Sequence, residues 1–155
     1  MTPTRTPPDH PDDADDLRAE LDRLVVHRQQ DLHRLWELLM SPLGFSRRSL
    51  WVTFVDRDGR PLPQLMEVDE LPDGDAAVEV GRLFGLLTDA FGDVLDDLAL
   101  AFLVVRPGRA GLHDDDRRLA AALLAGAREA GVRCHPVHVA DDARLQPVTP
   151  DDLAA

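Results

Sequence analysis

Lysine, asparagine, isoleucine and tyrosine are absent from the 155-residue chain, and cysteine occurs once. One cysteine cannot form an intramolecular disulfide or a cysteine-built zinc site, so Cys134 is expected to be a small buried thiol. All 17 Lys or Arg positions are arginine. The four missing residue types have AT-rich codons, which indicates a GC-rich genome such as that of an actinobacterium.

Long apolar runs are also missing. No stretch approaches the roughly 20 apolar residues of a membrane helix, and the first residues lack the basic and apolar parts of a signal peptide. We therefore expect a cytoplasmic protein without membrane contact. The 29 acidic residues against 17 basic ones give a net charge of -12, which repels phosphate backbones and predicts no nucleic-acid binding.

Hydrophobic residues make up 44% of the chain, enough for one core. Residues 1–13 are rich in proline and aspartate and are expected to be a disordered tail. Over 14–41, apolar residues recur at three- and four-residue steps, which predicts one amphipathic helix. Its apolar face includes Leu24, Val25, Leu35 and Trp36. Because this face is too apolar for water, we expect it to pack on the domain, on a second copy or on a partner protein.

Residues 48–149 are predicted to form one α/β (α+β) domain, followed by a C-terminal tail at 150–155. Strands are expected at 50–56 and 62–68, joined by an Asp58-Gly59 turn, and at 98–105, 132–139 and 144–148. Helices are expected at about 75–91 and from 114 to Gly131. This order predicts three layers, with helices on both sides of a mixed sheet and a JAB/MPN- or deaminase-like topology.

The end of strand 98–105 and the helix after it carry the most specific motif. The strand leads into the loop RPGRAG (106–111), and the helix opens with HDDD (113–116). This region resembles the JAB/MPN superfamily, and within it RadC-like proteins, whose strand ends in His-x-His-Pro-Ser-Gly and whose helix opens with Ser-x-x-Asp. Pro107 and Gly108 match that pattern, whereas Val104 and Arg106 stand at the two histidine positions and His113 stands at the serine.

The resemblance covers about residues 50–148 and implies the fold of that superfamily without its zinc chemistry. A zinc hydrolase needs imidazoles and a carboxylate around one ion, with a glutamate to move the proton of bound water. Only Asp116 has an obvious counterpart; Glu67 stands near the position of the glutamate, and Arg106 opposes a cation. We therefore expect no metal, no cofactor and no catalysis. MPN domains without metal ligands commonly bind partner proteins, which implies a noncatalytic interaction or scaffold module that engages a protein partner or forms a homodimer.

A second interpretation stays open for the loop and helix start at 106–113. Arg106, Arg109 and His113 lie beside a helix N-terminus, which attracts anions, so the loop is a candidate site for a small-anion or peptide sensor or a divergent hydrolase. The simpler explanation is pairing of the arginines with Asp114 or Asp115.

Two other kinds of zinc site are not supported. His135 and His138 are three residues apart, so an extended strand would direct them to opposite faces. The His-x-Glu and Pro-Cys-x-x-Cys signatures of zinc deaminases are missing, which excludes that activity but not that topology.

Overall fold

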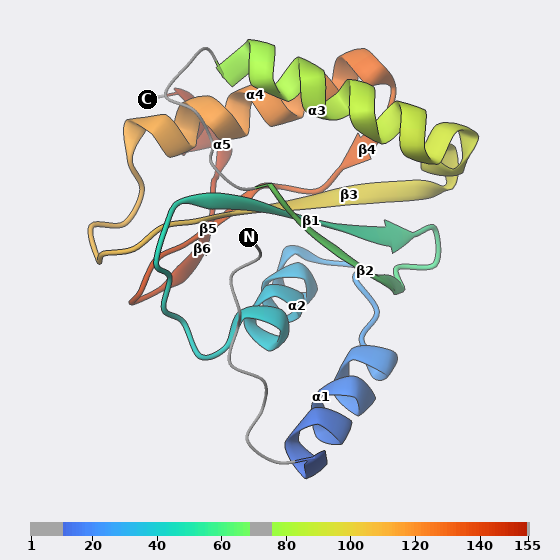
Figure 1. Cartoon of the computed structure of the whole chain (residues 1–155), viewed down its shortest axis with the longest axis vertical. Coiled ribbons are helices and arrows are strands. Elements are labelled where there is room, and N and C mark those ends of the chain that lie inside the picture. The colour runs from blue at the N-terminus through green and yellow to red at the C-terminus, as the bar shows by residue number, and fades with distance from the viewer. Residues whose placement is uncertain (1–10, 69–75, 155) are drawn as a thin grey trace.

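A mixed six-stranded sheet forms the centre of the computed structural model, which describes residues 11–68 and 76–154 (Figure 1). The strand order is β2-β1-β3-β5-β6, and β4 also pairs with β3. The strands are β1 (Ser49–Asp56), β2 (Pro61–Val68), β3 (Leu98–Val105), β4 (Arg133–Cys134), β5 (His138–Ala140) and β6 (Leu145–Pro147). The helices are α1 (Pro11–Arg23), α2 (Gln29–Met40), α3 (Ala76–Phe91), the 3₁₀ helix η1 (Gly92–Asp97), α4 (Asp114–Ala130) and α5 (Pro150–Ala154).

The helices lie on both faces of the sheet. Helices α3 and α4 cover one face, and α2 covers the other, with α1 beyond it (Figure 1). This confirms the predicted three-layer α/β arrangement. No helix in the described part of the chain is long and apolar enough to cross a membrane.

Strand β3 is central, and all its residues are buried. It runs antiparallel to β1 along its whole length, from Ser49 opposite Val105 to Asp56 opposite Leu98, and parallel to β4 and β5. Burial on both faces explains why its sequence is continuously apolar rather than alternating.

The pleat of the sheet divides the core into two clusters. Leu50 and Phe102 point toward α3 and α4, whereas Trp51 and Leu103 point toward α2. On the first side, α3 and α4 approach closely at Gly126, where a Cβ atom would lie 2.8 Å from Val80 and 2.9 Å from Phe84.

The N-terminal region corrects the prediction of one helix over 14–41. It forms two helices, and residues 24–28 between them are not helical. The Val26 amide donates to the Gly59 carbonyl at 2.7 Å, and the Asp31 carboxylate accepts the backbone N–H groups of His27 and Arg28. Both sets of bonds favour an extended segment and a new helix start, which periodicity alone does not reveal.

The predicted ends of the chain also change. Helix α1 begins at Pro11, inside the predicted tail 1–13, and residues 1–10 lie outside the described residues. The predicted strand 132–139 is split into β4 and β5, because Pro136 interrupts the pairing. The predicted tail 150–155 contains α5, whose start is capped by the reciprocal bonds of Thr149 and Asp152.

Candidate functional site

Asp116 is a fully buried carboxylate in the first turn of α4. Its Oδ1 atom accepts a 2.6 Å hydrogen bond from Nη2 of Arg106, whose side chain is 12% exposed. Its Oδ2 atom accepts the backbone N–H of His113 at 3.0 Å, and Nε of Arg48 lies 3.7 Å from Oδ1. The carboxylate is therefore held by two guanidinium groups and by the backbone at the helix start.

The sheet register explains why the two arginines meet there. Ser49 is opposite Val105, so Arg48, just before β1, and Arg106, just after β3, lie at the same end of adjacent strands. Alternation along the strands directs both toward the α4 side. Arg106, at a histidine position of the resembled motif, thus neutralises the one matching carboxylate. Among the described residues, no group of three or more His, Cys, Asp or Glu side chains converges to hold a metal ion.

Glu67 lies on the opposite face of the sheet from Asp116. It is opposite Trp51, which belongs to the α2-side cluster. Its carboxylate accepts hydrogen bonds from Ser49 Oγ at 3.2 Å and from Arg47 Nη2 at 3.5 Å. Because the sheet separates the two carboxylates, the structure does not bring Glu67 and Asp116 into one site.

The loop 106–111 is fixed by carboxylates from the segment after β5. Asp142 accepts the Gly108 N–H at 2.8 Å and the Phe45 N–H at 2.9 Å, and Asp141 accepts the Gly111 N–H at 3.0 Å. The bonds from Gly108 and then Phe45 lower the pKa of Asp142. Burial alone would raise the pKa of Asp141, but backbone bonds from Ala143, Arg144 and Gly111 outweigh it and lower the pKa. The Gly108 and Gly111 amides, which an anion would need, thus bind the protein's own carboxylates.

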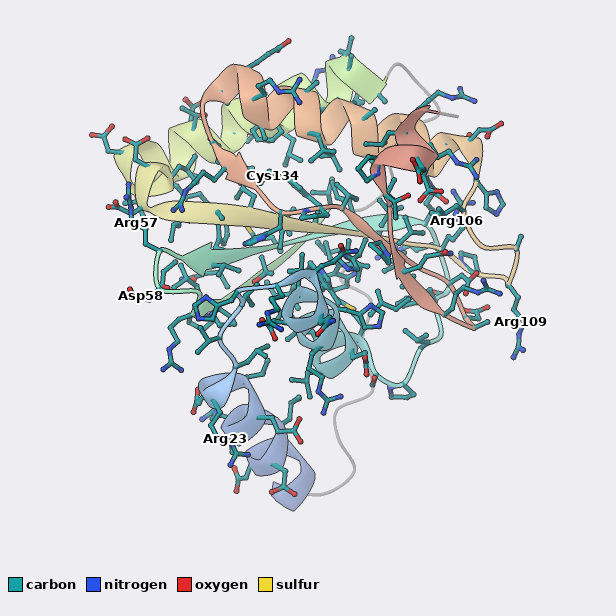
Figure 2. The ribbon with its side chains drawn as sticks, turned by 180° about the vertical axis from the view of Figure 1, so that it is seen from behind. Arg23, Arg57, Asp58, Arg106, Arg109 and Cys134 are labelled. Carbon is teal, nitrogen blue, oxygen red and sulfur yellow. The ribbon has the colours of Figure 1, made fainter. Side chains whose placement is uncertain are left out.

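The side chains of the three predicted ligand residues do not all converge on one point. Arg106 is turned inward to Asp116, and the backbone of His113 contacts the same carboxylate. Arg109 is exposed at the outer end of the loop and points away from Arg106 (Figure 2). The sequence predicted that Arg106 or Arg109 would pair with Asp114 or Asp115. Arg106 pairs instead with Asp116, and Asp114 pairs with Arg117 at 2.8 Å.

The predicted interface residues lie largely inside the protein. Leu35 and Trp36 of α2 are buried in the α2-side cluster, Leu24 is half-buried against it, and Val25 is half-buried. Most of the apolar face that was predicted to be available to a partner therefore packs on the chain's own sheet.

His138 is a buried titratable residue whose environment the sequence did not reveal. Nδ1 lies 3.2 Å from the Pro136 carbonyl oxygen, and the ring centroid lies 5.9 Å from that of His33 on α2. Burial lowers the pKa of His138 to about 4, so the ring is neutral near pH 7. A neutral ring that donates from Nδ1 leaves Nε2 as an acceptor, and this buried atom has no hydrogen-bond partner within the described ranges. The break at Pro136 hides this position, because strand alternation does not continue through it.

No protein-family model, curated protein or solved structure matches this chain. Its function must therefore be argued from its own residues.

Proposed function

We propose that this chain is a noncatalytic JAB/MPN-like domain, similar to RadC-like proteins, that binds a partner protein in a bacterial cytoplasm. The observation that carries the proposal is the buried pair of Arg106 and Asp116. Under this proposal, Arg106 stands at a position where the resembled hydrolases hold a metal ligand, and it pairs with the one carboxylate that matches their motif.

The charges of this site oppose a hydrolytic metal. A cation bound by Asp116 would have to displace a 2.6 Å charge-assisted hydrogen bond and approach Arg48 as well. Glu67, on the other face of the sheet, is not placed to take a proton from water held near Asp116. Both features favour a domain that retains the scaffold without the reaction.

The alternative is a small-anion or peptide sensor, or a divergent hydrolase, at 106–113. Arg109 is its best remaining cation, since it is exposed, but the Gly108 and Gly111 amides already bind Asp142 and Asp141. An external anion would have to compete with two internal carboxylates. The geometry therefore favours the interaction module.

The test combines partner capture with metal analysis on the full chain. The tagged protein is expressed in a GC-rich bacterial host, captured proteins are identified by mass spectrometry, and each candidate is purified and titrated against the chain by calorimetry. We expect a direct complex with micromolar or tighter affinity and no stoichiometric zinc after dialysis. Zinc that is retained by the native chain and lost from Asp116→Ala would overturn the noncatalytic assignment.

Phosphate titration followed by amide NMR distinguishes the small-anion sensor from the interaction module. Saturable shifts at Gly108, Gly111 and His113 that disappear in Arg109→Ala, without any direct protein complex, would favour the sensor. Unchanged amide positions up to millimolar phosphate support the interaction module.

A further inference from the structure

The outer face of α3 carries exposed apolar side chains. Three large apolar residues are exposed in the described part of the chain: Val78 (50%), Leu86 (68%) and Val94 (56%). Val78 and Leu86 belong to α3, and Val94 follows in η1. The opposite side of α3 is buried against α4 and the sheet, so the exposed side chains face away from the domain (Figure 1).

Two glycines lie on the outer face of α3, on the edge away from Leu86. A Cβ atom added at Gly81 or Gly85 would meet nothing within 4 Å, so neither glycine is required by packing inside the domain. Glycine inside a helix lowers helix stability. At 100° per residue, Gly81 and Gly85 lie on the same outward arc as Arg82, Leu86 and Asp89. The arc therefore carries Leu86 at one edge and the two glycines at the other, with Arg82 and Asp89 between them.

Residues of opposite charge lie on either side of Leu86 along the helix. Arg82 lies about one turn before Leu86, and Asp89 about one turn after it, and all three are exposed. A twofold axis level with the Gly85–Leu86 peptide would place two α3 helices antiparallel, with Leu86 of one copy against Leu86 of the other. The same axis would bring Arg82 of each copy opposite Asp89 of the other. The same face of two copies would therefore form both an apolar contact and a charged contact.

We propose that the outer face of α3 binds a second copy of this chain in this antiparallel arrangement. The inference rests on the proposed function, because it assigns the surface and one partner to a protein-binding domain. The occupant is a second copy because the Arg82–Asp89 charge pattern is complementary to itself under a twofold rotation, which also brings the two Leu86 side chains together. Helix α3 has 16 residues, and a contact limited mainly to it is smaller than the roughly 800 Å² per partner of a standard interface. The dimer is therefore weak, in the micromolar range.

The experiment is sedimentation equilibrium of the purified full chain from low micromolar to millimolar concentration. The native chain should dimerise reversibly, and Leu86→Glu should abolish the dimer because two carboxylates would face each other across the twofold axis. Arg82→Glu should weaken dimerisation by about tenfold, because it faces Asp89 with a like charge. The double variant Arg82→Glu/Asp89→Arg should restore it.

Arg118→Glu, an equal charge reversal at an exposed position of α4, is the matched control and should leave the dimer unchanged. A native chain that stays monomeric at every concentration overturns the proposal. So does a dimer that survives Leu86→Glu, or a double variant that does not recover. Circular dichroism verifies that each variant is folded. If Leu86→Glu is unfolded, the comparison of Arg82→Glu with Arg82→Glu/Asp89→Arg tests the proposed dimer. Partner capture is measured separately, so failure of the α3 dimer would leave the proposed function standing.

Discussion

Arg106 at the end of β3 and Asp116 in the first turn of α4 are joined by a 2.6 Å hydrogen bond that is shielded from solvent. The bond closes the loop between the central strand and the helix that covers it. Asp116 also binds the His113 amide, so one carboxylate fixes both the strand end and the helix start.

Asp116→Ala should destabilise the fold by about 3–5 kcal/mol, because it leaves the largely buried Arg106 guanidinium without its partner carboxylate. The measurement is urea-induced unfolding at pH 7. Asp115→Ala is the matched control: it removes an exposed carboxylate from the same helical turn and should cost less than about 1 kcal/mol. Equal losses in the two variants would mean that Asp116 acts through the helix dipole and not through the ion pair.

Local sequence patterns predicted much of the α/β domain. Strand β3 has the predicted bounds, 98–105, because a strand covered on both faces is uniformly apolar and ends where charged residues begin. Helix α4 ends at Gly131, which adopts the left-handed conformation with φ 71° expected of a C-terminal glycine. These features depend on residues close together in the chain.

The candidate site was less predictable because its contacts join distant residues. Asp142 binds the amide of Phe45, 97 positions away. Val26, in the segment between α1 and α2, donates to the Gly59 carbonyl in the turn between β1 and β2. The sequence shows that acidic residues follow Arg106 closely. Only Asp116 faces inward on α4 and binds Arg106, whereas Asp114 and Asp115 face solvent.

Gly126→Ala should destabilise the protein because its new methyl group would enter the contact between α4 and α3. The Cβ position lies 2.8 Å from Val80 and 2.9 Å from Phe84. Overpacking of this kind costs about 1–3 kcal/mol, more than the gain of at most about 1 kcal/mol from replacing a helical glycine. Gly81→Ala, where the methyl group meets open space, should instead stabilise the monomer by roughly 0.5–1 kcal/mol. Thermal unfolding at low protein concentration compares the two; a stabilised Gly126→Ala variant would contradict the tight contact.

Asp142→Ala should loosen the loop 106–111 without unfolding the domain. It removes the acceptor for the Gly108 and Phe45 amides, and water replaces these two hydrogen bonds only in part. Hydrogen exchange at these two amides should accelerate by about fivefold, while exchange in β3 stays slow. Asp142→Asn, which retains one acceptor oxygen, should give an intermediate effect. Unchanged exchange in the alanine variant would show that other contacts hold the loop.

The buried His138 ring should make the protein acid-sensitive above the range in which its carboxylates titrate. The pKa of His138 is about 4 in the folded state against 6.5 for a free histidine, because burial penalises the charged ring. Between these values the unfolded chain binds more protons than the folded chain. The free energy of unfolding should therefore fall as pH drops below 6.5, by up to about 3 kcal/mol near pH 4.

Three hydrogen-bonded carboxylates titrate below this window, and His135 contributes within it. Hydrogen bonds lower the pKa values of Asp31, Asp142 and Asp152 from 3.8, so the stability that these carboxylates contribute is lost at lower pH. The pKa of His135 is also lowered by burial, so part of the slope should belong to it.

His138→Leu tests the assignment, because it removes the titrating ring from its apolar site beneath α2. Urea unfolding from pH 4 to pH 8 should show a clearly smaller slope for this variant than for the native chain, whatever its stability at pH 8. His27→Gln, at an exposed position, should retain the native slope. A His138→Leu variant with the full native slope between pH 4 and pH 6.5 would mean that other histidines carry the acid sensitivity.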